Sequence, residues 1–212
     1  MTITLADLLT VASIGLVQLL AVMSPGPSFL ITARTAVAQS RTAGVKVALG
    51  LGAGTVVWAV AALLGLNVLF HAFPPLFIAM KVVGALFLLW IAFQILRHSA
   101  DPIILDTAKA GAVENPFLKG LLTQLSNPKV VVFFGSIFVA MLPSSVPAWM
   151  AVTLVVIVSL NEVWWYSALA LFFGSERVRR FYAKAKVWID RVTGVFLGVL
   201  GGKLLLSSAE AI

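Results

Sequence analysis

The sequence predicts an all-α, polytopic membrane protein with six transmembrane helices arranged as two inverted three-helix repeats. Of its 212 residues, 61% are hydrophobic and only 11% are charged, and its mean hydropathy is +1.06. A soluble domain of this length must cover its surface with polar side chains, and 15 Lys and Arg with 8 Asp and Glu are too few for that. Six apolar stretches, and the alternation of basic charge between them, give the number of helices.

Each apolar stretch is close to the roughly 20 residues that a helix needs to cross the hydrocarbon core of a bilayer. The six stretches are roughly Leu8–Ala33, Val47–Phe70, Leu76–Leu96, Gly120–Leu142, Trp149–Phe173 and Val187–Leu206. The first resembles a signal peptide, but only Asp7 precedes it as a charge and its apolar run is longer than about 15 residues. We therefore expect it to remain as a span of a single membrane domain over residues 1–212.

Basic residues gather in the segments that follow the first, third and fifth stretches. They are Arg34, Arg41 and Lys46, then Arg97, Lys109 and Lys119, then Arg177, Arg179, Arg180, Lys184 and Lys186. The segments around 71–75 and 143–147 contain no Lys or Arg. Because short cytoplasmic loops carry the excess of Lys and Arg, the three basic segments are predicted to face the cytoplasm and both termini to lie outside.

The same pattern accounts for the net charge of +7. The basic residues follow membrane topology and are not interleaved with aromatic residues on one surface, so we expect no nucleic-acid partner. With no Cys there can be no disulfide and no thiolate metal site. The two His fall in segments assigned to opposite sides, and no catalytic triad or carboxylate pair is present, so we expect no metal, no cofactor and no enzyme activity.

Weak internal similarity divides the chain at a polar run, Asp101–Asn115. Ser24-Pro25-Gly26 matches Ser126-Asn127-Pro128-Lys129, Val57-Trp58 matches Val163-Trp164, and Val83–Leu88 resembles Thr193–Gly198, in the same order. We predict one repeat over about 8–96, a cytoplasmic linker over about 97–118, and a second repeat over about 119–206. Three spans per repeat make the halves cross the membrane in opposite directions, as in many secondary transporters.

The first apolar stretch is interrupted by Pro25, Gly26 and Pro27. Each proline lacks an N–H, so the carbonyls of Ala21 and Met23 lose their helical partners. Freed backbone groups are tolerated at membrane depth only against protein or a water-filled cavity. The motif therefore favours a broken helix that lines a polar cavity, with an ordinary helix kink as the alternative.

Asn127, Pro128 and Lys129 hold the corresponding place in the fourth stretch. A lysine that faces lipid at mid-membrane is costly, which favours a position inside the protein. The alternative is a helix that starts near Asn127, with Lys129 reaching the cytoplasmic interface. Interruptions at matching points of two repeats are the sequence pattern expected of a transporter's binding site.

Glu162 lies near the centre of the fifth stretch, directly after Asn161, and no other acidic residue lies near mid-membrane. A carboxyl group in hydrocarbon favours its neutral form unless a cation pairs with it. Glu162 is therefore a candidate proton carrier or a contact for a substrate ammonium group, with a structural hydrogen bond or ion pair to Lys129 or an interhelical amide as the alternative. Asn161 is a candidate substrate contact beside it.

These motifs together resemble the LysE/RhtB family of amino-acid exporters. The resemblance rests on Met23–Pro27, on Ala43–Lys46 before the Gly-rich second stretch, on Asn127–Lys129 and on Asn115–Gly120, and it covers essentially the whole chain. It implies a protein of the bacterial cytoplasmic membrane that exports amino acids such as homoserine, threonine, lysine, arginine or leucine, driven by the proton gradient.

The sequence thus predicts a secondary transporter that works by alternating access on a small zwitterion. The break residues 25–27 and 127–128, with Lys129 and Asn161, would hold the substrate, and Glu162 would exchange the proton. Export of another small solute or a cation, and a non-transporting membrane scaffold, remain as alternatives.

Overall fold

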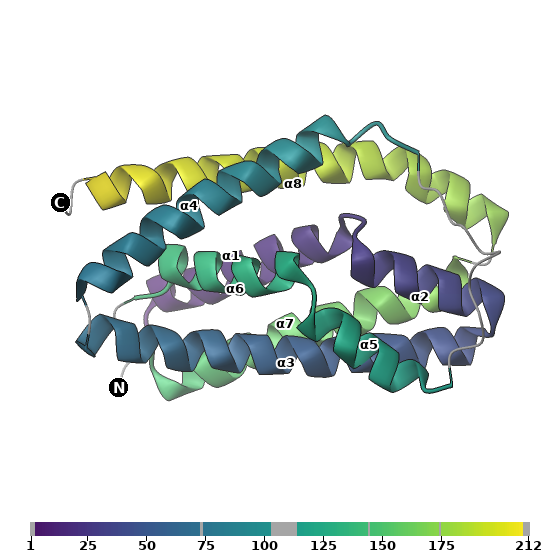
Figure 1. Ribbon diagram of the computed structural model, residues 1–212, viewed down its shortest axis with the longest axis horizontal. Coiled ribbons are helices and arrows are strands. Elements are labelled where there is room, and N and C mark those ends of the chain that lie inside the picture. The colour runs from purple at the N-terminus through teal and green to yellow at the C-terminus, as the bar shows by residue number, and fades with distance from the viewer. Residues whose placement is uncertain (1–2, 73, 103–113, 144, 174, 210–212) are drawn as a thin grey trace.

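The computed structural model describes residues 3–72, 74–102, 114–143, 145–173 and 175–209, which form eight α-helices and no strand (Figure 1). The helices are α1 (Leu5–Met23), α2 (Pro27–Ala38), α3 (Arg41–Ala72), α4 (Pro74–Arg97), α5 (Pro116–Leu125), α6 (Pro128–Met141), α7 (Ala148–Phe172) and α8 (Glu176–Ala209). The predicted all-α class is confirmed over this part of the chain.

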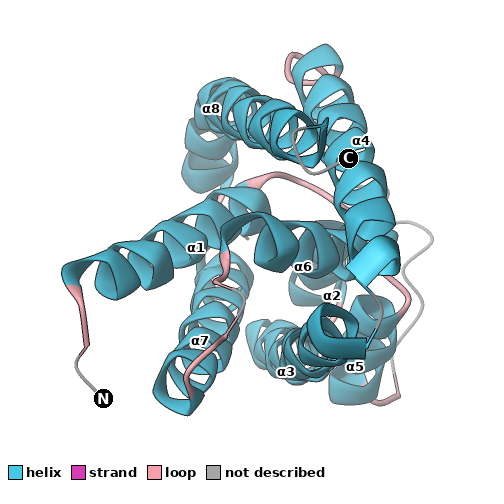
Figure 2. Cartoon of the chain, turned by 90° about the vertical axis from the view of Figure 1, so that its left-hand side faces the viewer, coloured by secondary structure: helices cyan, strands magenta, loops and turns pink. Residues whose placement is uncertain are grey.

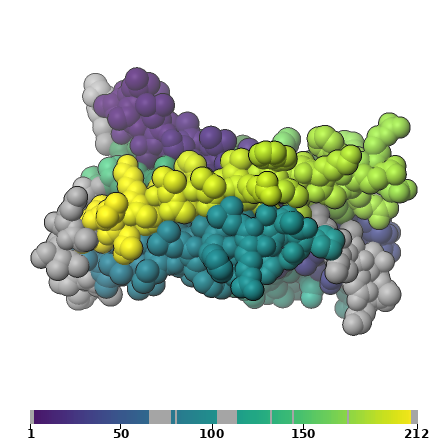
Figure 3. All heavy atoms as spheres, turned by 90° about the horizontal axis from the view of Figure 1, so that it is seen from above, coloured from purple at the N-terminus to yellow at the C-terminus, as the bar shows by residue number. Residues whose placement is uncertain are grey.

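The helices lie in three layers, all roughly along the long axis of the molecule (Figures 1 and 2). α4 and α8 pack side by side as one outer layer, and their side chains cover the upper face (Figure 3). α3 packs against α5 and α7 in the opposite layer, and α1, α2 and α6 lie between. The middle layer therefore holds the whole of the first interrupted segment, α1 and α2, and the second half of the other, α6.

The distribution of side chains fits a membrane protein. Large apolar side chains such as Leu16, Val152 and Val199 are exposed on the outside, whereas Gln18 and Gln124 are buried. Among the described residues, three helical segments are long and apolar enough to cross a membrane, namely Leu5–Met23, Arg41–Gly65 and Ala148–Phe172. The α5–α6 pair, bent by 55°, passes the same test as one span. The six-span count remains a prediction.

The helix ends that carry the basic residues lie together at one end of the molecule. These are the junction of α2 with α3, the end of α4, and the starts of α5 and α8 (Figure 1). The start of α1 and the end of α8 lie at the opposite end. This arrangement agrees with the alternation of charge along the sequence, while the side that faces the cytoplasm remains a prediction.

Several helices extend past the apolar stretches at this basic end. α3 begins at Arg41 rather than Val47, and α8 begins at Glu176 rather than Val187, so the basic segment after the fifth stretch is helical and not a loop. Its Lys, Arg and Ala residues are good helix formers, and Glu176 pairs with Arg180 one turn later at 3.6 Å. Of the predicted linker, residues 103–113 lie outside the described residues, and its last residues belong to α5.

Candidate functional site

Both interrupted segments break completely into two helices, and the breaks meet in the middle layer. Ser24 and Gly26 are extended between α1 and α2, and Ser126 and Asn127 separate α5 from α6. Pro27 and Pro128 each occupy the first turn of the new helix. There the missing proline N–H removes no helical hydrogen bond. These segments are therefore pairs of helices and not kinked single ones.

The carbonyl groups that the first break frees are bonded by side chains from distant helices. Lys129 Nζ donates to the oxygen of Ala21 at 2.9 Å and to that of Ser24 at 3.3 Å. The Tyr182 hydroxyl donates to the oxygen of Met23 at 2.6 Å. Burial, and secondarily the charge of Asp190, raise the pKa of Tyr182, so the hydroxyl keeps the proton that it donates. The carbonyls of Ala21 and Met23, which the sequence predicts to lose their helical partners, thus accept hydrogen bonds inside the protein.

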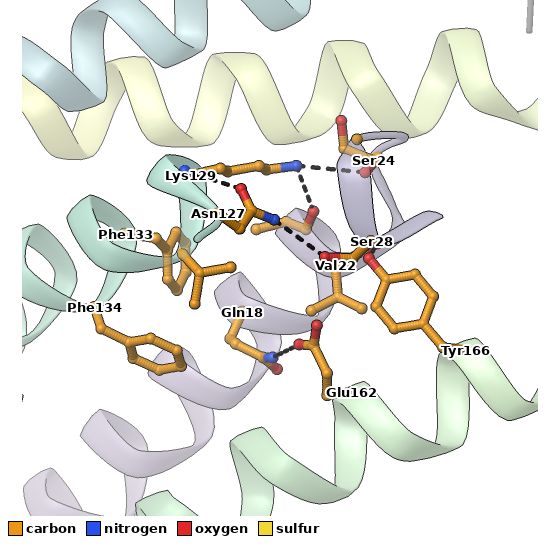
Figure 4. Close-up of a pocket in the computed structure, with 13 residues that line it drawn as sticks. Gln18, Val22, Ser24, Ser28, Asn127, Lys129, Phe133, Phe134, Glu162 and Tyr166 are labelled. Carbon is orange, nitrogen blue, oxygen red and sulfur yellow. Dashed lines mark hydrogen bonds between the residues drawn. The ribbon is translucent and has the colours of Figure 1, made fainter. Parts of the chain in front are cut away.

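The helix α6 does begin next to Asn127, as the alternative predicted. The Lys129 side chain, however, reaches the end of α1 inside the protein and not the cytoplasmic interface of the membrane (Figure 4). Asn127 caps α6 by accepting from the Lys129 N–H at 3.1 Å, and its Nδ2 donates to Ser28 Oγ at 3.0 Å. Since Ser28 lies in the first turn of α2, Asn127 ties the second break to the first.

Glu162 is 3% exposed, and its carboxyl oxygens accept from two amides. Gln124 Nε2 of α5 donates to Oε1 at 2.7 Å, and Gln18 Nε2 of α1 donates to Oε2 at 3.1 Å. Figure 4 shows Gln18 pointing to the Glu162 carboxyl group beneath the two breaks. Lys129 bonds the backbone carbonyls instead, so the structure favours the amide alternative over an ion pair.

A continuous chain of hydrogen bonds runs from Glu162 to both breaks. Gln124 also donates to Thr55 Oγ1 and accepts from Ser28 Oγ, each at 2.7 Å. Asn161 Nδ2 donates to Gln18 Oε1 at 2.9 Å and so joins the same network. The sequence analysis missed Gln18, Ser28, Thr55 and Gln124. Polar residues inside apolar stretches were the signal that could have found them, because such groups must find partners in the protein.

Two cavities adjoin the breaks. A small one of about 40 Å³ lies beside Ser24, Gly26, Asn127 and Lys129, with Glu162 among the residues around it (Figure 4). A larger one of about 580 Å³, here called the vestibule, separates the breaks from α4 and α8. The vestibule is lined by Ser24–Pro27, Leu30, Phe87, Trp90, Ile91, Gln94, Ile95, His98, Asp101, Pro102, Asn127–Lys129, Lys186 and Asp190. Its volume is within the range of small-molecule sites, and it extends to the basic end of the molecule.

The vestibule also brings in Asp190, an acidic residue that the sequence analysis did not select. It lies on α8 near the start of the sixth predicted span and is 3% exposed. Its Oδ1 accepts from Ser24 Oγ at 2.8 Å, and its Oδ2 lies 2.9 Å from Lys186 Nζ. Lys186, expected in a cytoplasmic loop, is buried because it faces Asp190 one turn away and donates to the carbonyls of His98 and Ser99.

Comparisons of the sequence with known proteins identify a family. The family model described as "LysE type translocator" matches residues 19–208. The chain is 34% identical to a threonine efflux protein of Salmonella typhi and 33% identical to one of Escherichia coli K12, each over 92% of this chain and 97% of the relative. It is 28% identical to a leucine efflux protein of an Enterobacter species, over 84% of this chain and 85% of the relative. No solved structure matches.

Proposed function

The chain belongs to the LysE type translocator family, and we propose that it exports a small amino acid from the bacterial cytoplasm across the inner membrane. Members of this family are transporters and not enzymes. The relatives named for threonine and leucine efflux support the substrate class. The observation that carries the proposal is the meeting of two helix breaks at a buried polar site beside the vestibule.

The breaks supply groups suited to an anionic end of the substrate. Two of the three N–H donors of Lys129 are used by backbone carbonyls, which leaves one for a carboxylate. No side chain caps the start of α2 at Gly26, and Gly26 lines the vestibule. An uncapped helix start presents backbone N–H groups and a partial positive charge to an anion. The substrate carboxylate is proposed to bind between them, with Pro25, Pro27, Asn127 and Pro128 shaping the pocket.

Glu162 is proposed to exchange the proton that drives export. It is buried, it carries an ionisable group, and its partners Gln18 and Gln124 belong to the two interrupted segments. A change in its protonation therefore changes the hydrogen bonds that hold both segments. Asn161 is proposed to position Gln18 rather than to touch the substrate directly, since its amide donates to Gln18 and to the carbonyl of Gly15.

The proposed topology has six spans in two inverted repeats, with both termini outside. Several features support it: α1–α2 and α5–α6 are both broken, α3 packs against α7, and α4 packs against α8, with equivalent helices antiparallel (Figure 1). Because the sequence has no Cys, single cysteines can report the side of the membrane. In intact cells an impermeant maleimide should label Thr4→Cys and not Ser40→Cys. The reverse pattern would refute the orientation.

The test of the proposed function is an efflux screen of all twenty amino acids, followed by transport in proteoliposomes. The protein should raise the efflux of at least one amino acid and should not raise metal tolerance. A pH difference of one unit across the membrane supplies about 1.36 kcal/mol per proton. Exchange of one proton per substrate should therefore sustain an approximately tenfold ratio of substrate concentrations for each pH unit.

Glu162→Gln should remove this dependence on the pH gradient, whereas the control Glu176→Gln, at an exposed side chain, should keep it. Unchanged pH-driven transport by Glu162→Gln would refute the coupling role. Absence of any efflux would favour the scaffold alternative.

A further inference from the structure

The vestibule contains a buried acidic group with no role in the proposed function. Asp190 of α8 has two carboxylate oxygens, and each accepts one hydrogen bond, from Ser24 and from Lys186. A carboxylate can accept about four hydrogen bonds, so Asp190 keeps acceptor capacity toward the cavity that it lines. Lys186 has no such reserve, because its three donors are taken by Asp190 and by the carbonyls of His98 and Ser99.

Ser24 places Asp190 next to a second charge of opposite sign. Its carbonyl oxygen accepts from Lys129 Nζ at 3.3 Å, and its hydroxyl donates to Asp190 Oδ1 at 2.8 Å. One residue of the first break therefore contacts a cation from α6 and an anion from α8. In Figure 4 the Lys129 side chain extends to Ser24 beneath the ribbon of α8. Lys129 and Asp190 both line the vestibule.

An amino-acid substrate needs acceptors for its ammonium group as well as donors for its carboxylate. The backbone carbonyls that the prolines free would also suit an ammonium group, but those of Ala21 and Met23 already accept one hydrogen bond each, from Lys129 and Tyr182, and carry no net charge. The carboxylate of Asp190 is a buried, charged acceptor on the vestibule wall and has capacity to spare. A charge-assisted hydrogen bond of this kind is stronger than one to a neutral carbonyl.

We infer that Asp190 and Lys129, held on either side of Ser24, form the binding site for the head group of a neutral α-amino acid. Asp190 accepts from the ammonium group, and Lys129 with the start of α2 donates to the carboxylate. The walls beyond the charges are apolar, formed by Leu30, Phe87 and Ile91, which suits an uncharged side chain. This inference rests on the proposed function and specifies its substrate site.

The test uses the full chain in proteoliposomes with L-threonine and L-leucine as probes. Each probe competes against an analogue without the ammonium group (3-hydroxybutanoate, 4-methylpentanoate) and one without the carboxylate (the amide). The unaltered protein should prefer the amino acid over both analogues. The variants are Asp190→Asn and the double variant Asp190→Asn/Lys186→Gln, which leaves no unpaired buried cation if the single variant fails to fold.

Both variants should weaken amino-acid binding about tenfold or more, the size expected for a hydrogen bond to a charged group. Binding of the analogue without the ammonium group should stay unchanged, so the preference for the amino acid over this analogue should be lost. The control Lys184→Gln, at an exposed position of α8 outside the vestibule, should keep the preference, because Asp190 and its partners are untouched. Lys129→Gln should instead lose the preference over the amide.

A structural role for Asp190 would weaken both ligands equally, and that result, or an unchanged preference in both variants, would overturn the inference. Export of only charged amino acids would overturn the neutral substrate class and leave amino-acid export intact. Export of no amino acid would refute the proposed function itself.

Discussion

Gly54 of α3 leaves the space that the Gln124 side chain fills, and its replacement by Ala tests the network around Glu162. A Cβ added at Gly54 would lie 2.7 Å from Gln124 Cβ and 3.0 Å from its Cγ, where ordinary contacts begin at about 3.5 Å. Gln124 would have to move by about 1 Å, which is enough to break bonds now 2.7 Å long to Glu162, Thr55 and Ser28.

Each of the three bonds is worth about 1 kcal/mol, or about 1.5–3 kcal/mol for the bond to Glu162 when its carboxyl group is ionised, which gives about 3–5 kcal/mol together. Against this, Ala favours a helix over Gly by about 1 kcal/mol. We expect Gly54→Ala to lower the free energy of unfolding by about 2–4 kcal/mol relative to the unaltered protein, and to reduce transport because Glu162 loses its shorter hydrogen bond.

The matched control is Gly65→Ala in the same helix, where an added Cβ meets nothing within 4 Å. Denaturant unfolding in detergent and transport in proteoliposomes are measured for both variants. Gly65→Ala should be as stable as the unaltered protein or slightly more so, with normal transport. If Gly54→Ala were as stable as Gly65→Ala and transported as well, the reasoning that the contact at Gly54 fixes the hydrogen bonds of Gln124 would be refuted.

Two further predictions concern the first break. Changing Pro25 and Pro27 together to Ala returns two N–H groups that a continuous helix can use. We expect the transport rate per inserted molecule to fall about tenfold or more while membrane insertion is unchanged. A tenfold loss corresponds to destabilising the broken conformation by about 1.4 kcal/mol. Full transport by the double variant would refute the need for a break. Tyr182→Phe leaves the Met23 carbonyl without its 2.6 Å bond and should cost about 1–3 kcal/mol. An unfolded tyrosine ionises near pH 10, whereas the raised pKa of the folded Tyr182 keeps its hydroxyl protonated above that pH. The contribution of Tyr182 to the free energy of unfolding is therefore constant below about pH 10 and falls by about 1.4 kcal/mol per pH unit above it. The free energy of unfolding, measured against pH, should fall less steeply above pH 10 in Tyr182→Phe than in the unaltered protein, by about 1.4 kcal/mol per unit.

The helix breaks could be predicted from the sequence because their cause is local. A proline without an N–H frees a defined carbonyl whatever surrounds it, so Ala21 and Met23 followed directly from Pro25 and Pro27. Which groups bond those carbonyls could not be predicted. Lys129 and Tyr182 are more than a hundred residues away, and only the packing of α6 and α8 against α1 brings them there.

Asp190 was not predicted as a site residue, because its position along the chain is one where a membrane span is expected to begin. It follows a run of basic residues at the start of an apolar stretch, where charges are normally solvated. Its spacing from Lys186 was a usable signal, since residues four apart share a helix face and can neutralise each other on entry into the membrane. The burial of the pair, however, depends on the end of α4, which supplies carbonyls to Lys186.

The hydrogen-bond network gives a physical route between the proposed substrate site and Glu162. A substrate carboxylate attracts the whole Lys129 ammonium group, including the two N–H groups that bond the Ala21 and Ser24 carbonyls. Weakening those bonds loosens α1 from α6. The first break also holds Ser28, which donates to Gln124, and Gln124 donates in turn to Glu162. Movement of the break on substrate binding therefore alters the hydrogen bonds of the carboxyl group, and through linkage a change in its protonation must alter substrate affinity. That reciprocity requires part of the pH dependence of substrate affinity to be lost in Glu162→Gln.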